Sequence, residues 1–148
     1  MCIRDSSTAT QEYIIRVGLC SDNDLDSPTC GNGVYFEYNR TNSTSWRGRT
    51  VQNYGTATQT STTKAVTAGG WTTLKWVATS ANSVTFYVKN PGETTYTSLG
   101  AVGSASTVPN AAAYATSLMF YIDKNVGGTT ASFNVDYVDY FNDFTSNR

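Results

Sequence analysis

The sequence predicts an all-β domain built as a sandwich of two antiparallel sheets. Apolar and polar residues alternate with a period of two in segments rich in aromatic and β-branched side chains, as expected for strands with one buried face. Gly, Asn, Ser or Pro bound these segments, which recur roughly every ten to fifteen residues, as in antiparallel sandwiches. No segment combines a helical period with helix caps. The five clearest segments are Gly33–Tyr38, Trp71–Ala78, Ser83–Asn90, Ser117–Lys124 and Ser132–Phe141.

The first half of the chain predicts four strands separated by polar segments. In Glu12–Leu19 and Val34–Asn39, apolar residues occupy every second position. The polar loop Cys20–Asn32 connects these two strands. Trp46–Tyr54 and Thr56–Val66 then form a predicted hairpin rich in threonine, which is both β-branched and polar and therefore suits half-exposed strands.

The second half predicts further strands at Trp71–Thr79, Val84–Asn90 and Tyr96–Val102, followed by the segments beginning at Ser117 and Ser132. Helix is limited to one expected turn near Ala111–Ala115. In each predicted strand, every second side chain is expected to face the core. The large side chains expected there are Phe36, Trp76, Phe86, Phe120 and Phe133.

Composition excludes some classes of partner. Charged residues are 14% of the chain and the net charge is −1, whereas nucleic-acid binding calls for a basic surface stripe. No apolar run approaches the roughly eighteen residues of a membrane-spanning helix. We therefore expect neither a nucleic acid nor a membrane as partner.

The N-terminal residues 1–11 are expected to be an artefactual or disordered tail. Met1–Ser6 looks like a translated sequencing-adapter scar, of the kind that opens proteins assembled from environmental reads, which would make the chain a metagenomic fragment. The alternative is a genuine disordered tail. Residues 12–144 then form a single domain, truncated at its N-terminus.

Cys20 and Cys30 flank the polar loop between two predicted strands. A disulfide closing this loop is plausible for an extracellular protein, and two free buried thiols are the alternative. If the bridge forms, the two Cα atoms must lie within about 7 Å. Zinc is not expected, because two thiolates without histidine leave half of its ligand shell empty.

The order of several strand sequences resembles a known fold family. Gly33–Tyr38 reads Gly-Val-Tyr-Phe-Glu-Tyr, and Trp71–Trp76 reads Trp-x-x-Leu-x-Trp. Ser83–Val88 follows as Ser-Val-Thr-Phe-Tyr-Val, and Val135–Val138 closes the series as Val-Asp-Tyr-Val. Over about residues 12–141 this is similar to the concanavalin A-like jelly roll of lectins, laminarinase-type glucanases and bacteriophage virion appendage proteins. The resemblance implies a jelly-roll sandwich.

The sequence contains few residues in patterns that are typical of catalysis. The glucanase branch carries Glu-x-Asp-x-x-Glu on one strand, and hydrolysis needs two carboxylates facing the scissile bond. Here Glu12, Glu37 and Glu93 are far apart, while Asp136 and Asp139 would point to opposite faces of a regular strand. No histidine is present to act as the base of a nucleophilic triad. The sequence therefore predicts that the protein is not an enzyme.

A calcium site is one interpretation of Asp22, Asp24 and Asp26, which alternate along the polar loop. Loop carboxylates can converge on this oxygen-seeking cation, although the EF-hand pattern is absent because Ser27 and Gly33 occupy its glycine and glutamate positions. A solvated acidic turn is the alternative. No other cofactor is expected.

Glycan binding is predicted from the aromatic residues outside the core phase. Sugars present apolar faces that stack on flat rings, so the candidate residues are Tyr35, Trp46, Tyr87 and Tyr121, with Arg47 and Arg49 near Trp46. The alternative is that these rings pack beneath loops or against another subunit.

The favoured function is a non-enzymatic structural domain of a virion appendage, such as a tail fibre or decoration protein, that contacts host glycans. Its expected partners are other virion subunits, including copies of itself, and cell-surface glycans. One alternative is a carbohydrate-binding module from a larger secreted microbial enzyme. A degenerate glucanase is the third hypothesis.

Overall fold

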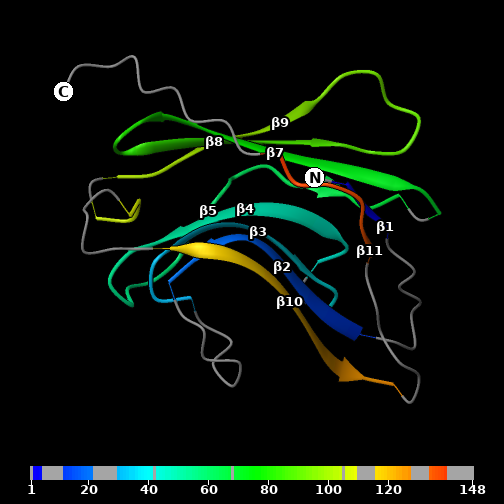
Figure 1. Cartoon of the computed structure of the whole chain (residues 1–148), viewed down its shortest axis with the longest axis horizontal. Coiled ribbons are helices and arrows are strands. Elements are labelled where there is room, and N and C mark those ends of the chain that lie inside the picture. The colour runs from blue at the N-terminus through cyan, green and yellow to red at the C-terminus, as the bar shows by residue number, and fades with distance from the viewer. Residues whose placement is uncertain are drawn as a thin grey trace.

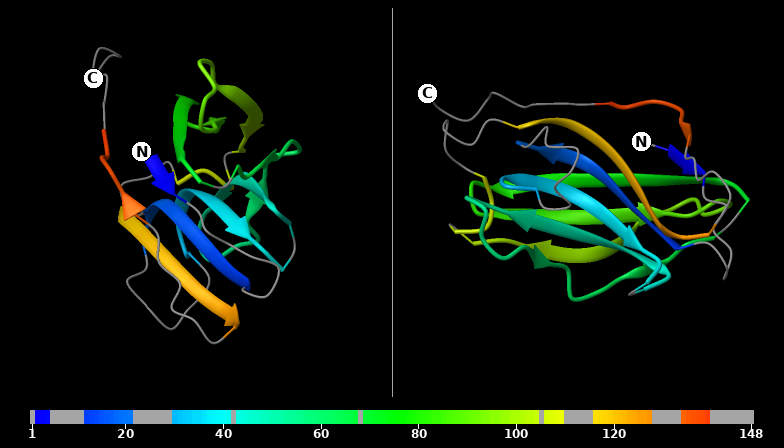
Figure 2. Two further views of the ribbon diagram at one scale, coloured as in Figure 1. Left: turned by 90° about the vertical axis from the view of Figure 1, so that its right-hand side faces the viewer. Right: turned by 90° about the horizontal axis from the view of Figure 1, so that it is seen from below.

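The computed structural model describes residues 2–4, 12–21, 30–41, 43–67, 69–104, 106–109, 116–127 and 134–139. Throughout this part of the chain the protein is all-β. Two antiparallel sheets lie one above the other as the layers of a sandwich (Figure 1 and Figure 2). The predicted fold class is confirmed.

The strands, in chain order, are β1 (Cys2–Arg4), β2 (Glu12–Cys20), β3 (Gly33–Asn39), β4 (Ser45–Val51), β5 (Thr58–Gln59), β6 (Lys64–Ala65), β7 (Trp71–Ser80), β8 (Ser83–Lys89), β9 (Thr97–Val102), β10 (Ser117–Val126) and β11 (Asn134–Val135).

The first sheet has five strands in the order β11-β1-β7-β8-β9. The second sheet has the order β10-β2-β3-β4-β5, with β6 also pairing with β4, which makes six strands. All pairings between these described strands are antiparallel. The long strands of the six-stranded sheet lie beneath β7, β8 and β9 in Figure 1.

The core lies between the sheets and follows the period-two pattern. Strand β2 alternates half-buried and buried residues, and its buried phase points inward. At the centre, the rings of Phe36 and Phe86 meet edge-on with centroids 5.1 Å apart. Gly48 makes this contact possible, because a Cβ at that position would meet the Phe86 ring. The sheets therefore pack around aromatic side chains opposite a glycine.

The N-terminal residues differ from the expectation of a disordered tail at 1–11. Cys2–Arg4 form β1, which pairs with β7 on one side and with β11 on the other. The backbone ladder on both sides holds this segment within the five-stranded sheet.

Several elements are shorter than predicted. In the predicted hairpin of Trp46–Tyr54 with Thr56–Val66, the second arm contains only the short strands β5 and β6, both of which pair with β4. Asn53 and Tyr54, whose φ angles are 51° and 56°, form its turn, which the hydrogen bond from Gly55 N–H to the Gln52 carbonyl closes at 3.0 Å. The last strand ends at Val135, and residues 136–139 are not in a strand. The predicted turn at Ala111–Ala115 lies outside the described residues.

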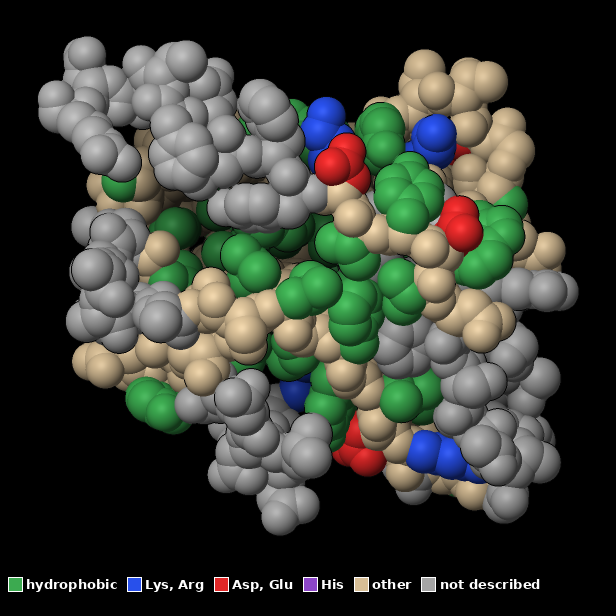
Figure 3. Space-filling view, in the orientation of Figure 1, with side chains coloured by type: hydrophobic (Ala, Val, Ile, Leu, Met, Phe, Trp, Pro, Cys, Tyr) green, Lys and Arg blue, Asp and Glu red, His purple; other side chains and the backbone are tan. Residues whose placement is uncertain are grey.

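Two predicted core positions need correction. Trp76 is only partly buried, although it packs against the core. Phe120 is 40% exposed and its neighbour Leu118 is 49% exposed, both on β10, which is the edge strand of its sheet. An edge strand has fewer neighbours to cover its inner face. In the space-filling view of Figure 3, which has the orientation of Figure 1, hydrophobic side chains gather across the middle of the surface. Phe133 lies outside the described residues.

Candidate functional site

The outer face of the six-stranded sheet, here called the arginine face, carries charged and aromatic side chains from four adjacent strands. One row of register partners runs Tyr121 on β10, Arg16 on β2, Glu37 on β3 and Arg47 on β4. Arg49 lies two residues from Arg47 and therefore on the same face. The antiparallel register thus brings together residues from four separate parts of the sequence.

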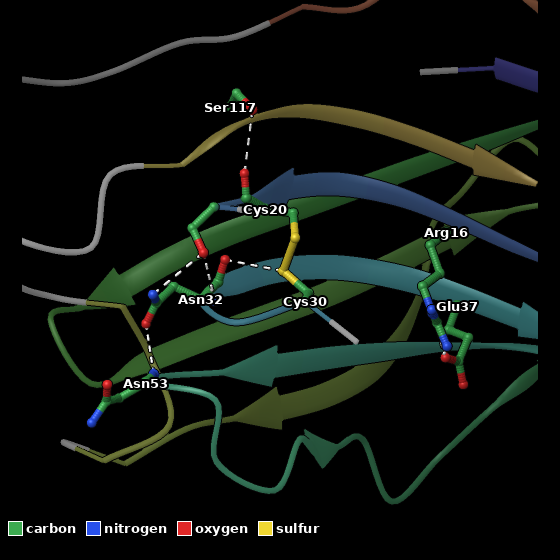
Figure 4. Close-up of a disulfide and its surroundings, with 8 residues drawn as sticks. Arg16, Cys20, Cys30, Asn32, Glu37, Asn53 and Ser117 are labelled. Atoms are coloured by element: carbon green, nitrogen blue, oxygen red, sulfur yellow. Dashed lines mark hydrogen bonds and ion pairs between the residues drawn. A yellow bond between two sulfur atoms is a disulfide. The ribbon is translucent and has the colours of Figure 1, made fainter. Parts of the chain in front are cut away.

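Glu37 is the centre of this arrangement. Its side chain is 3% exposed and lies between Arg16 and Arg49, whose side chains are 11% and 24% exposed. Arg16 donates from Nε to Oε2 at 2.9 Å, a pair shown in Figure 4. Arg49 donates from Nη1 to both carboxylate oxygens at 2.8 Å. Burial of this carboxylate is tolerable because two guanidinium groups compensate its charge.

Tyr121 extends the row toward the edge of the sheet. The Arg16 guanidinium carbon lies 5.5 Å from the centre of the Tyr121 ring, within cation–π range. Partial burial raises the pKa of the Tyr121 hydroxyl, and the charge of Asp123 adds to this rise, while Arg16 opposes it. Tyr121 therefore presents a neutral phenol beside a cation.

Arg47 and Arg49 retain unused donors. Arg47 donates from Nη1 to Gln59 Oε1 at 3.1 Å. Within the described part of the chain, the buried Nε atoms of Arg47 and Arg49 have no hydrogen-bond acceptor. A guanidinium offers five N–H donors in a planar fork that matches carboxylates, so the Nη groups of both side chains can donate to a further oxygen.

A disulfide and a small apolar cluster close one end of the arginine face. Cys20 and Cys30 are bonded, with their Cα atoms 5.7 Å apart. They pack with Tyr35 and Val51 in a cluster separate from the main core, which Met119 also contacts. Burial raises the pKa of the Tyr35 hydroxyl, while Arg49 and Arg16 oppose the rise.

Asn32 bonds residues on either side of this disulfide (Figure 4). Its backbone N–H donates to Ser21 Oγ at 2.9 Å, and its side-chain oxygen accepts from the backbone N–H of Asn53 at 2.6 Å. Asn32 therefore links the chain after β2 to the turn after β4. These contacts fix the end of the arginine face at which Tyr35 is covered.

The four predicted glycan-binding residues do not form one surface. Trp46 is buried in the main core at 1% exposure, and the prediction of an exposed ring there is wrong. It alternates with Arg47 and Arg49, so it points inward where they point outward. Tyr35 faces outward but is 3% exposed beneath the disulfide cluster, so it is not an exposed ring either. Tyr121 remains on the arginine face.

Tyr87 lies on the other sheet. Strand β8 places it outward, opposite Lys75 of β7. The Lys75 ammonium is 5.7 Å from the Tyr87 ring centre and 5.6 Å from that of Tyr96, and Lys89 is 5.2 Å from the latter. Cations lie over these rings as Arg16 lies over Tyr121, but the lysine ammonium groups lack the planar donor fork that the guanidinium groups supply on the arginine face.

Comparison with known proteins places the chain in a family. Residues 3–137 match the family described as SO2946-like, C-terminal domain. The chain belongs to this family. No curated protein and no solved structure matches it.

The described residues of this SO2946-like domain include no group of three His, Cys, Asp or Glu residues placed to hold a metal ion. Asp22, Asp24 and Asp26, the predicted calcium ligands, lie outside the described residues. Within the described residues, no helix is long and apolar enough to cross a membrane.

Sequence reasoning missed the Arg16–Glu37–Arg49 cluster. A signal was present, because Arg16 and Glu37 each occupy the outward phase of a strand whose other phase is apolar. A charged residue flanked by core positions predicts an outward side chain. What the sequence lacks is the register that sets one strand against the next, since Arg16 and Glu37 are 21 residues apart.

Proposed function

We propose that this SO2946-like domain is a non-enzymatic binding domain of a virion appendage, and that it contacts glycans through the arginine face. The observation that carries the proposal is the row Tyr121, Arg16, Glu37 and Arg47, which sets an aromatic ring beside guanidinium donors on one surface. Rings and planar donors are the groups that hold sugars. The virion setting rests on the resemblance of the strand sequences.

The state of Glu37 supports binding in preference to hydrolysis. A retaining or inverting glycosidase needs one carboxyl to give a proton and another to attack or activate water. Both oxygens of Glu37 accept hydrogen bonds from arginines, so this carboxylate is held as an ion-pair partner. Glu12 shares the outer phase of β2 but hydrogen-bonds Thr41 at 3.2 Å, beyond the end of the arginine cluster.

A glycan array probed with a multimerised form of the domain tests the proposal. Multimerisation matters because weak single sites gain avidity when several bind at once. We expect binding to a defined set of glycans, lost in Tyr121→Ala and retained in Tyr87→Ala on the other sheet. Binding that depends on Tyr87 alone would assign the activity to the wrong face and contradict the proposal.

A second candidate function is a carbohydrate-binding module from a secreted enzyme. The Cys20–Cys30 disulfide favours any oxidising, extracellular location and so supports this candidate as well. The sequence that flanks the domain in its full-length gene separates the two: a fibre repeat or stalk supports the appendage, and a catalytic domain supports the module. Incubation with β-glucans should release no reducing sugar in either case, and release would revive the glucanase hypothesis.

A further inference from the structure

We infer that the ligand of the arginine face is an acidic glycan, whose sugar carboxylates are bound by Arg47 and Arg49. This inference rests on the proposed function and names its ligand class. The chain as a whole carries a net charge of −1. At the centre of the arginine face three arginines nevertheless stand against one glutamate, a local excess of two positive charges, while the other outward acids of these strands, Glu12 and Asp123, lie toward one end of the face.

The donors that remain after the internal contacts point to a carboxylate. Within the described residues, Arg49 makes its hydrogen bonds to Glu37 through Nη1 alone, and Arg47 bonds Gln59 through Nη1 alone. Each guanidinium therefore keeps an Nη2 group, whose two N–H bonds are available to an incoming anion. Since Glu37 already holds Arg49 in place, little side-chain entropy is lost when a ligand binds there.

The residues around these arginines favour an acidic sugar over a small inorganic anion or a polymer with densely spaced negative charges. Tyr121 offers an apolar ring edge and a neutral hydroxyl beside Arg16. Gln59, which is exposed, offers an amide to sugar hydroxyls next to Arg47. Asp123 lies on the same face as Tyr121, two residues along β10, and disfavours a continuous polyanion such as nucleic acid. A polymer with spaced carboxylates and apolar sugar faces suits all three neighbours.

Titration calorimetry with oligogalacturonate and with neutral laminari-oligosaccharide of equal length tests the inference at physiological ionic strength. We expect the wild-type domain to prefer oligogalacturonate by about tenfold or more, as one charge-assisted hydrogen bond would give. Arg47→Gln should abolish most of this preference. Arg47→Lys should recover only part of it, because lysine keeps the charge but not the planar fork. Arg47 lies outside the Glu37 ion pairs, so these variants should fold normally.

Lys75→Gln is the matched control, since it removes one positive charge next to tyrosines on the opposite sheet. We expect it to change the affinity for oligogalacturonate less than twofold. If Arg47→Gln and Lys75→Gln lost equal affinity for oligogalacturonate, or if the wild-type domain bound dextran sulfate as tightly as oligogalacturonate, the domain would attract anions in general and the inference would be overturned. Equal binding of neutral and acidic oligosaccharides at the arginine face would overturn it while leaving the proposed function standing. No binding to any glycan on the array would end both.

Discussion

At the scale of single residues, Glu37 determines both the stability and the chemistry of the arginine face. It is an acidic side chain on the outer side of a sheet, yet it is almost fully buried by its two arginine partners. Such a cluster contributes little net stability compared with apolar residues of the same shape, but the loss of one member leaves the others uncompensated. Its value lies in fixing the positions of Arg16 and Arg49.

Glu37→Gln should therefore destabilise the domain by about 3 kcal/mol, because Arg16 and Arg49 are left without their counter-charge in a buried setting. Urea denaturation measures the change. Glu93→Gln is the matched control, since Glu93 pairs with Lys64 at 2.6 Å in a more exposed setting, where an ion pair contributes less. Equal and small effects of the two substitutions would show that the arginines reorient to solvent without cost.

Glu93 also predicts a pH dependence. Its hydrogen bonds from the Lys64 side chain and from the Asn90 backbone lower the pKa of the Glu93 carboxyl below its ordinary value of 4.5. A carboxyl with a lowered folded-state pKa stabilises the fold above its unfolded pKa, and this contribution is lost as pH falls through the folded pKa. The Tm difference between wild type and Glu93→Gln should therefore be full at neutral pH and shrink below pH 4.5. A constant difference from neutral to strongly acidic pH would contradict this.

At the scale of strands, the sequence was a good guide to alternation and a poor guide to neighbours. The inward phases of β2, β3 and β8 follow directly from their apolar periodicity. The register of β2 against β3, which creates the Arg16–Glu37 pair, depends on the loop between them and on packing against the other sheet. The inward position of Trp46 could have been predicted from alternation, because Trp46 has the opposite phase to Arg47, whose charge predicts an outward side chain.

The sequence also did not predict which outward residues are buried by segments from distant parts of the chain. Tyr35 has the outward phase that was expected, but Cys20, Cys30 and Val51 cover it. These residues come from three different stretches of chain, so no local pattern reveals the cluster. The pairing of β5 and β6 with β4 is the hairpin that the sequence predicted, and only its short length, two residues in each strand, was not expected.

The disulfide gives a prediction at this scale. Cys20 and Cys30 are separated by 10 positions, and closing a loop of that length reduces the entropy of the unfolded chain by an amount worth about 3 kcal/mol. The double substitution Cys20→Ala with Cys30→Ala should lower the free energy of unfolding by about that amount in urea denaturation. Oligosaccharide binding should survive, because Arg47 and Arg49 are held by contacts that do not involve the cysteines. An unchanged midpoint would mean that the unfolded chain is already constrained there.

At the scale of the whole molecule, the two sheets are held together by a few large side chains that meet across the sandwich. Phe36 from one sheet meets Phe86 from the other, and Gly48 provides the space beside the Phe86 ring. The arginine face lies on the opposite side of the strands β3 and β4 that carry Phe36 and Gly48. The strands β3 and β4 therefore carry core residues on one side and Glu37 and Arg49 on the other.

Gly48→Ala tests the contact between Gly48 and the Phe86 ring. The added methyl group would meet the Phe86 ring, so we expect a loss of about 1–3 kcal/mol from overpacking. Phe86→Ala alone should cost about 3–5 kcal/mol, because it leaves a cavity in the core. The double variant should lose less than the sum of the two, since the methyl group enters the space that the ring vacates. Urea denaturation of all four proteins gives the coupling energy, and strict additivity would show that Gly48 and Phe86 do not share this contact.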